Sequence, residues 1–222
     1  MDSPANFIDH TLLKPDTSKV EIAALCEEAV EHGFASVCVP PVFVTQASQL
    51  LYGSEVAVCT VVGFPLGYQT TQAKVFEAHQ AVASGAGEVD MVINLGAARI
   101  TDYAAVRDEI RKIVAATDSG LVTVIVECCL FDDAVKRKLA EIVAESGADY
   151  VKTSTGFAAS GATLEDVSLL FRAVAGRLGV KAAGGSRDWQ TCEAMLAAGA
   201  TRIGTSAGVM IMQQWRTSAD LF

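Results

Sequence analysis

Two kinds of segment alternate along the chain. Short, almost continuously apolar runs rich in Val and Ile recur, which is typical of strands covered on both faces. Longer stretches between them carry apolar residues at helical spacing, and several end at a glycine. The predicted strands are Phe7–Asp9, Ser36–Val39, Val56–Val62, Val89–Asn94, Leu121–Cys128, Tyr150–Ser154, Val180–Ala182 and Arg202–Gly204. The predicted helices are Ser18–His32, Thr71–Ser84, Asp102–Ala116, Asp132–Glu145, Leu164–Ala175, Trp189–Ala198 and a last one that runs to about Trp215.

This alternation predicts a parallel sheet with right-handed helical crossovers, and therefore an α/β fold. A doubly wound open sheet usually has about five or six strands. Eight strands, in repeats of about 28 residues, favour a closed (β/α)8 barrel of the TIM type, opened by a short N-terminal strand. No linker, low-complexity segment or shift in composition divides the chain, so we expect residues 1–222 to form a single domain.

Composition narrows the possible functions. Of the 222 residues, 51% are hydrophobic and 19% are charged, which excludes a disordered chain and supplies a sizeable core. The net charge of −9 argues against a nucleic-acid partner, because phosphate backbones require clustered Lys and Arg. The start of the chain has no secretory pattern, and no apolar run approaches the ~20 residues of a membrane span. We therefore expect a cytoplasmic protein with no membrane partner.

The cysteines do not indicate a metal site. Six cysteines and three histidines are scattered over predicted strands and helices, and no two cysteines have the CxxC spacing. We expect reduced thiols and no bound metal.

Two of the eight lysines stand inside predicted strands. Lys152 and Lys181 are 29 positions apart, which is one strand–helix repeat, so they should lie at equivalent heights on strands about 4.8 Å apart. Two neighbouring ammonium groups should depress one lysine pKa, and a neutral amine is the nucleophile that forms a Schiff base with a carbonyl. A salt-bridged core lysine is the structural alternative for each. Lys14 is kept as a site candidate because it follows the first strand, and the remaining lysines are expected on the surface: Lys19, Lys74, Lys112, Lys136 and Lys138.

A carboxylate also lies inside a predicted strand. Asp90 stands among apolar residues, where it needs either a cation or a role in proton transfer. Because strand residues alternate between faces, Glu88, Asp90 and Asn94 should share one face. We expect Asp90 and Asn94 to lie together inside the barrel.

Glycine-rich loops follow the last two predicted strands. Barrels of this type often bind phosphate with the loops after strands seven and eight, where glycines let backbone N–H groups approach the anion. Gly184 and Gly185 follow strand seven, and Gly204 and Ser206 belong to strand eight and the loop after it. Arg187 and Ser206 would add donors, and Thr155 with Gly156 would extend the cradle.

Six segments, in order along nearly the whole chain, resemble the 2-deoxyribose-5-phosphate aldolase family. They are 7–15 (FIDHTLLKP), 61–67 (VVGFPLG), 88–94 (EVDMVIN), 148–157 (ADYVKTSTGF), 180–185 (VKAAGG) and 202–206 (RIGTS). The two lysine-containing segments carry the most specific part of the resemblance.

The resemblance implies a class I aldolase that needs no metal or cofactor. Such an enzyme interconverts 2-deoxy-D-ribose 5-phosphate with D-glyceraldehyde 3-phosphate and acetaldehyde, in deoxynucleoside breakdown. It implies a Schiff base on Lys152, with Asp90 and Lys181 as proton donor and acceptor. It further places Asp9, Thr11 and Lys14 along the site and implies an oligomer of identical chains, a dimer or tetramer. The matched phosphate-loop residues are Gly156, Gly184, Gly185, Gly204 and Ser206.

The chain departs from the family pattern in a few places, and two rival functions stay open. Ser186 stands where the strand-seven loop usually has Ile, and Glu127 is followed by cysteine where Thr is more common. One rival is another Schiff-base barrel aldolase, such as a transaldolase-like or ketose-phosphate enzyme. A sugar-phosphate-binding regulator that has lost catalysis would keep the barrel and the phosphate loops.

Overall fold

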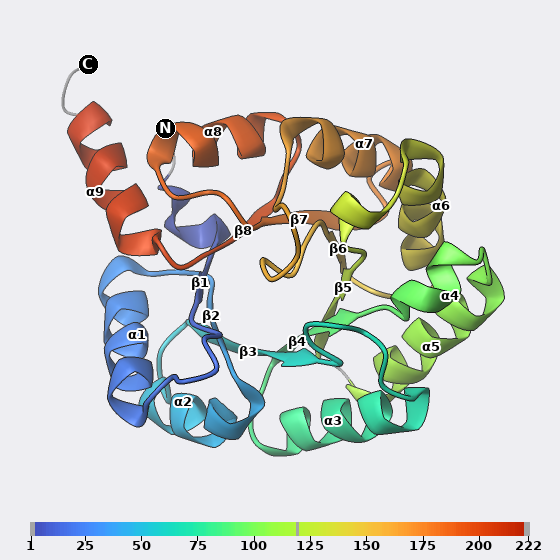
Figure 1. The fold of residues 1–222 in the computed structure, drawn as a ribbon. Coiled ribbons are helices and arrows are strands. Elements are labelled where there is room, and N and C mark those ends of the chain that lie inside the picture. The colour runs from blue at the N-terminus through green and yellow to red at the C-terminus, as the bar shows by residue number, and fades with distance from the viewer. Residues whose placement is uncertain (1–2, 119, 220–222) are drawn as a thin grey trace.

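The computed structural model describes residues 3–118 and 120–219, and eight parallel strands close into a barrel in the order β1 to β8 (Figure 1). The strands are β1 Ile8–Thr11, β2 Ser36–Val39, β3 Ala57–Val62, β4 Glu88–Val92, β5 Leu121–Ile125, β6 Tyr150–Lys152, β7 Gly179–Ala183 and β8 Arg202–Thr205. The fold class predicted from the alternation is therefore confirmed.

Helices surround the barrel. They are α1 Lys19–His32, α2 Val44–Leu50, α3 Thr71–Ala83, α4 Leu95–Arg99, α5 Tyr103–Ala116, α6 Asp133–Ala144, α7 Leu164–Val174, α8 Trp189–Ala197 and α9 Gly208–Ala219. Three short 3-10 helices complete the elements: η1 Pro4–Phe7, η2 Pro41–Phe43 and η3 Cys128–Leu130. Among the described residues, no helix is both long and apolar enough to cross a membrane.

Local sequence sets where the helices begin. Ser18 and Glu21 form a reciprocal capping box at the start of α1, and Gly33, with a φ of 69°, ends that helix in the left-handed conformation. Asp102, Asp132 and Asp188 accept a backbone N–H at the starts of α5, α6 and α8.

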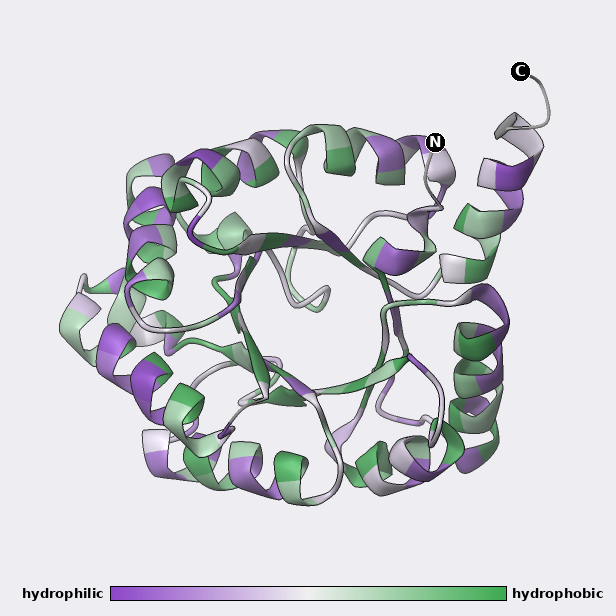
Figure 2. Ribbon diagram, turned by 180° about the vertical axis from the view of Figure 1, so that it is seen from behind, coloured by the Kyte–Doolittle hydropathy of each residue, from purple (hydrophilic) through white to green (hydrophobic). Residues whose placement is uncertain are grey.

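The main hydrophobic core lies between the strands and the helices. Outward-facing strand residues such as Val89 and Met91 belong to one buried apolar cluster with helix residues such as Ile110 and Leu139. Figure 2 shows the same division, since the strands are mostly hydrophobic while the helices carry both hydrophobic and hydrophilic residues. The inward-facing alternate positions are therefore free to hold polar groups.

Three strands end earlier than the apolar pattern predicts, and one of them is β6, which ends at Lys152 and not at Ser154. The predicted strand Leu121–Cys128 ends at Ile125, because Glu127 adopts a left-handed conformation with a φ of 52° and η3 follows. The predicted strand Val89–Asn94 ends at Val92, and Asn94 instead caps α4 by accepting the N–H of Ala97. The expectation that Asn94 shares the barrel interior with Asp90 is therefore wrong.

Lys74 was expected on the surface, and it is fully buried. Its Nζ lies 3.0 Å from Glu109 Oε2 and donates to the carbonyl of Val92 at 2.9 Å. Glu109 also accepts the N–H of Asn94, so this pair fastens α3 and α5 to the carboxyl end of β4. Lys136 is also less exposed than predicted, with 14% of its side chain accessible, because it lies 2.7 Å from Asp166.

We predict that Lys74→Met destabilises the fold by about 3–5 kcal/mol, because it leaves the Glu109 carboxylate buried without a cation. Urea unfolding followed by circular dichroism measures the change. Lys138→Met is the matched control, since Lys138 forms an exposed pair with Glu141 and should cost less than about 1 kcal/mol. Equal effects of the two substitutions would contradict a structural role for the buried pair.

Candidate active site

Strand register brings the two strand lysines together. Lys152 is the last residue of β6, and its Cα pairs directly with that of Lys181 on β7. Both side chains are almost completely buried. The predicted neighbourhood of Lys152 and Lys181 is thus present in the fold.

Asp90 bridges the two lysines from the opposite side of the barrel. Its Oδ2 lies 2.5 Å from Lys152 Nζ and 2.8 Å from Lys181 Nζ. Cys59 donates its thiol to Asp90 Oδ1 at 3.4 Å. The carboxylate is fully buried, so its charge is balanced within the barrel and not by solvent.

A second layer of charges lies deeper in the barrel. Asp9 Oδ2 is 2.7 Å from Lys181 Nζ, and Asp9 also pairs with Arg202 and accepts the Ser36 hydroxyl. Arg202 reaches Glu88 at 2.9 Å. Three acidic and three basic side chains therefore form one cluster, which we call the ionic cluster: Asp9, Glu88, Asp90, Lys152, Lys181 and Arg202.

The carboxylates determine the direction of the pKa shifts. Burial lowers the pKa of Lys181, but Asp9 and Asp90 outweigh it and hold that pKa well above the usual lysine value. Burial raises the pKa of Asp90, but Lys152 and Lys181 hold it well below its usual range. The expectation that like charge depresses a lysine pKa is therefore wrong for Lys181, because two carboxylates lie closer to it than sequence spacing reveals.

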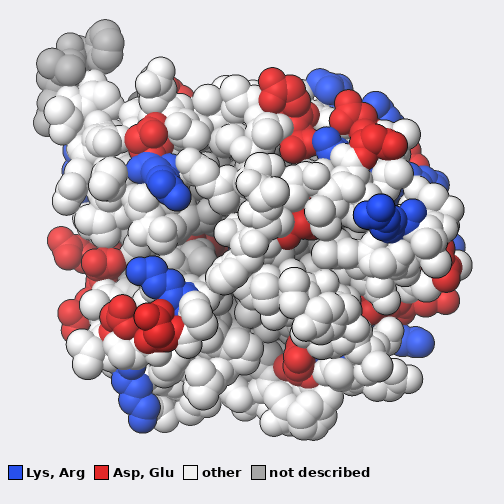
Figure 3. All heavy atoms as spheres, viewed as in Figure 1, with Lys and Arg blue, Asp and Glu red and all other residues white. Residues whose placement is uncertain are grey.

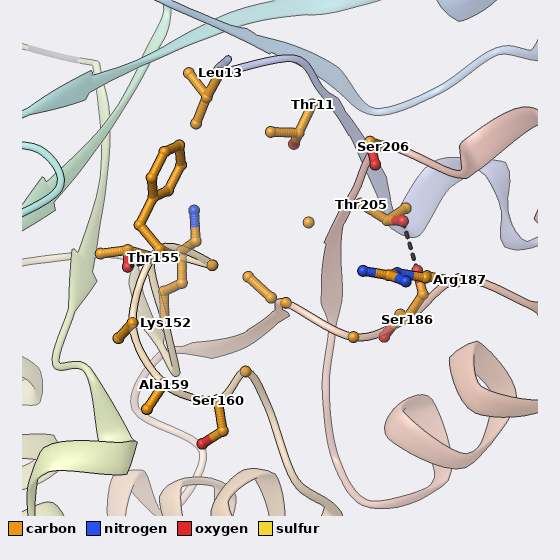
Figure 4. Close-up of a pocket in the computed structure, with 18 residues that line it drawn as sticks. Thr11, Leu13, Lys152, Thr155, Ala159, Ser160, Ser186, Arg187, Thr205 and Ser206 are labelled. Carbon is orange, nitrogen blue, oxygen red and sulfur yellow. Dashed lines mark hydrogen bonds between the residues drawn. The ribbon is translucent and has the colours of Figure 1, made fainter. Parts of the chain in front are cut away.

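A pocket of about 410 Å³ opens above the ionic cluster (Figure 4). Lys152 is the one member of the cluster among the residues that line it, whereas Lys181 and Asp90 lie beneath. Nine of the predicted site residues line the pocket: Thr11, Lys152, Thr155, Gly156, Gly184, Gly185, Arg187, Gly204 and Ser206. The two strand lysines therefore differ in access, although they are neighbours in the sheet.

The loops after β6, β7 and β8 form one side of this pocket. Gly161 fits against the backbone of Gly184, where a Cβ on Gly161 would lie 2.0 Å from the Gly184 carbonyl oxygen. Thr205 donates its hydroxyl to the Ser186 carbonyl at 2.6 Å, which fastens the β7 loop to the β8 loop. Arg187 is exposed and lines the same side. Glycine backbone that an anion can approach closely and a guanidinium at one end suit an anion.

Four predicted site residues lie outside the pocket lining: Asp90 and Lys181 lie beneath the pocket, and Lys14 and Asp9 lie elsewhere. Lys14 is exposed and its backbone carbonyl accepts from Thr17, so the structure does not bring it to the pocket. Asp9 is buried within the ionic cluster, where it contacts Lys181 and not the cavity. Neither Lys14 nor Asp9 therefore lines this pocket, and their place along the site stays a prediction.

Sequence reasoning missed several residues of the site. Leu13 and the loop from Phe157 to Gly161 line the pocket, and Arg202 and Glu88 complete the ionic cluster. Loop residues carry no periodic signal. Arg202 had a usable signal, since a charged residue beginning an apolar strand faces the same burial cost as Asp90.

The visible face of the molecule carries a mixed charge pattern (Figure 3). Lys and Arg side chains stand beside Asp and Glu side chains, and the described residues on this face form no broad basic patch.

Comparison with known proteins places the chain in a family. The model of the DeoC/LacD family aldolases matches residues 5–214. The chain belongs to the DeoC/LacD family of aldolases. The matched range spans all eight strands of the barrel and the positions of Lys152 and Lys181.

Relatives match almost the whole chain, and solved structures among them share its fold. A deoxyribose-phosphate aldolase of Syntrophotalea carbinolica is 55% identical over 221 residues, covering 100% of each chain. A solved structure named "QR15, an Aldolase" is 42% identical with a TM-score of 0.95 and covers 100% of both chains. The deoxyribose phosphate aldolase of Aeropyrum pernix, described as tetrameric, is 33% identical with a TM-score of 0.91, covering 98% of this chain and 94% of that one.

The ionic cluster predicts a specific loss of stability at alkaline pH. Because the folded-state pKa of Lys181 lies above the unfolded value of about 10.4, its stabilisation is complete below that pH and is lost as pH rises through the folded-state pKa. Asp9→Asn removes one of the carboxylates that raise this pKa. Above about pH 10.4, the free energy of unfolding of the wild type should therefore fall more steeply than that of the variant, by up to about 1.4 kcal/mol per pH unit.

Urea unfolding between about pH 9 and pH 12 checks this prediction. Glu21→Gln is the control, because Glu21 is an exposed capping residue of α1 and its loss should leave the alkaline slope unchanged. Parallel alkaline slopes for wild type and Asp9→Asn would show that Asp9 does not control the proton on Lys181.

Proposed function

We propose that this protein is a deoxyribose-phosphate aldolase, which cleaves 2-deoxy-D-ribose 5-phosphate reversibly into D-glyceraldehyde 3-phosphate and acetaldehyde. The observation that carries the proposal is the position of Lys152, whose amine reaches the pocket while its partners Asp90 and Lys181 lie beneath. The deoxyribose-phosphate aldolase named at 55% identity over the whole chain supports the choice of substrate.

Lys152 is the nucleophile in this proposal. Its neutral amine attacks the C1 aldehyde of the open-chain sugar, and loss of water leaves a protonated imine. The Asp90 carboxylate, 2.5 Å from Lys152 Nζ, is placed to balance this cationic imine. Because its pKa is held low, Asp90 stays ionised and serves as the counter-ion while charge develops at the nitrogen.

The imine then accepts the electron pair of the C2–C3 bond. The C3 hydroxyl loses its proton as the bond breaks, which releases D-glyceraldehyde 3-phosphate and leaves a neutral enamine on Lys152. Protonation of the enamine carbon and hydrolysis release acetaldehyde and restore the amine. Asp90 and Lys181 carry these protons, through a water where contact is not direct.

No cofactor is required by this route, because the protonated imine itself is the electron sink. Lys181 rests protonated because Asp9 and Asp90 raise its pKa, so it acts as a proton donor beside Asp90 and not as a second nucleophile. The different roles of the two lysines thus follow from their contacts.

The phosphate group binds at the opposite end of the pocket. Backbone N–H groups near Gly184, Gly185 and Gly204, with the Arg187 side chain, provide donors there. Binding energy from this end holds the aldehyde at Lys152 in one orientation.

The nucleophile is tested by reduction with borohydride in the presence of acetaldehyde, followed by peptide mapping. We expect an ethyl group on Lys152 in the wild type, and a loss of turnover in Lys152→Ala of at least about 1,000-fold, or about 4 kcal/mol of barrier. Lys138→Ala, at an exposed helix position, is the control and should keep full activity. An adduct on Lys181 would show that Lys181 is the nucleophile and that Lys152 has the supporting role. Turnover of Lys152→Ala within tenfold of wild type would refute the mechanism.

The phosphate end is tested with Arg187→Met. The loss of a charged hydrogen bond should raise KM for 2-deoxyribose 5-phosphate by about 10- to 100-fold. Cleavage of unphosphorylated 2-deoxyribose should change little, because it makes no contact at this end. Arg172→Met, on the outer helix α7, is the matched control and should alter neither value. An equal loss with both substrates would place Arg187 outside the phosphate site.

A further inference from the structure

Glu127 is a strained, buried residue at the edge of the pocket. Its φ of 52° lies in the left-handed region, which a residue with a side chain adopts at a cost of roughly 1–3 kcal/mol. Only 2% of the surface of Glu127 is exposed. Its carboxylate accepts hydrogen bonds from both the N–H and the hydroxyl of Thr155, the latter at 2.5 Å. Strain of this kind persists where the surrounding structure requires it.

The contact with Thr155 continues to Phe157. The Thr155 hydroxyl donates a hydrogen bond to Glu127 and accepts one from the N–H of Phe157 at 3.1 Å. Both its donor and its acceptor function are thus used within the protein. Thr155 therefore shapes the pocket, and its hydroxyl is already committed when a substrate arrives. Phe157 lines the pocket with 54% of its surface still exposed.

Phe157 meets a second aromatic residue from the far side of the barrel. Its ring lies edge-on to Phe64, with centroids 5.2 Å apart and planes at 86°. Phe64 follows β3, so the pair joins the loop after β3 to the loop after β6. Phe64 and Leu13 both pack against a small buried cluster of Cys38, Cys59 and Val61.

The pocket is consequently divided into two unlike ends. Figure 4 shows Leu13 and Lys152 on one side, and Ser186, Arg187 and Ser206 on the other. Of the apolar side chains, Leu13 and Phe157 line the pocket, and Phe64 lies against Phe157. The opposite end is built by glycines, hydroxyls and a guanidinium.

We propose that Glu127, acting through Thr155, holds Phe157 against Phe64, and that this aromatic pair selects carbonyl donors with no hydroxyl beside the carbonyl. The inference rests on the proposed function, because the donor is the molecule bound to Lys152. Phe157 contacts the donor, whereas Glu127 is a positioning residue.

The selection has a simple physical cause. A donor such as acetaldehyde presents a methyl group to the apolar side chains, whereas glycolaldehyde would bury a hydroxyl there without a hydrogen-bond partner. An apolar pocket discriminates against an added hydroxyl by about 10- to 100-fold. The cleaved sugar fits the same rule, since its C2 carries no hydroxyl.

The test is competitive trapping of Lys152. The protein is reduced with borohydride in equimolar acetaldehyde and glycolaldehyde, and the ethyl and hydroxyethyl adducts on Lys152 are counted by peptide mapping. Each ratio is divided by that of Nα-acetyl-lysine treated in parallel, which removes the intrinsic reactivity of the aldehydes. The wild type should favour the ethyl adduct by about 10- to 100-fold.

Phe157→Ser and Phe157→Leu form the matched pair of variants. Ser admits water and provides a hydroxyl partner, so the ratio should fall to within about threefold of unity, whereas Leu keeps an apolar wall and should stay close to wild type. Both variants should fold, because Phe157 is exposed on a loop. Phe76→Ala, at an exposed position of α3, controls for the loss of a surface aromatic and should leave the ratio unchanged.

Glu127 is tested in the same assay. Glu127→Gln keeps an acceptor for the Thr155 hydroxyl and should retain most of the selectivity, while Glu127→Ala should lower the ratio toward that of Phe157→Ser. A merely structural role would reduce the total yield of both adducts and leave their ratio unchanged.

The outcomes separate the two proposals. If neither aldehyde is trapped on Lys152 of the folded wild type, the proposed function fails. If Lys152 is trapped normally and the ratio is the same in wild type, Phe157→Ser and Glu127→Ala, the donor-selection proposal fails while the proposed function stands.

Discussion

The bridge from Asp90 to Lys152 and Lys181 is the interaction on which the rest of the site depends. A carboxylate buried in a barrel has no solvent to stabilise it, so it must be paired, and here two ammonium groups pair with it. Asp9 then pairs with Lys181 from below, and Arg202 with Asp9 and Glu88. Removal of any one charge would leave a partner unbalanced. The geometry of the ionic cluster is therefore set by the requirement that each buried charge has an oppositely charged partner.

The barrel can hold this ionic cluster because the stability of the fold comes mainly from other contacts. The apolar core packs between strands and helices, so inward-facing positions are released from hydrophobic packing. The buried pair of Lys74 and Glu109 works outside the barrel interior, where it fastens two helices to the end of β4. These two groups of buried charges therefore lie apart: the Lys74–Glu109 pair supports the architecture, and the ionic cluster supports the proposed chemistry.

The pocket joins two environments that suit two ends of one small molecule. Glycine loops and the Arg187 guanidinium gather after β7 and β8, while Leu13 and Phe157 line the pocket together with Lys152. An amine in apolar surroundings, with its counter-ions beneath it, is exposed to a carbonyl but shielded from competing polar groups. The contacts of Glu127 and Thr155 show that the apolar end is shaped by a hydrogen-bonded loop and not by strand residues alone.

Sequence alone determined the barrel, the pairing of Lys152 with Lys181, and the glycine loops, because these depend on periodicity and on spacing by one strand–helix repeat. It failed where a side chain's surroundings come from distant segments. Nothing near Lys74 in the sequence signals Glu109, which lies 35 positions away, and nothing near Lys181 signals Asp9. The pKa of Lys181, the exposed position of Lys14, and the contact of Phe157 with Phe64 were likewise decided only by the tertiary structure. Local patterns specify which face a residue occupies, whereas charge balance and pocket shape depend on which faces meet when the barrel closes.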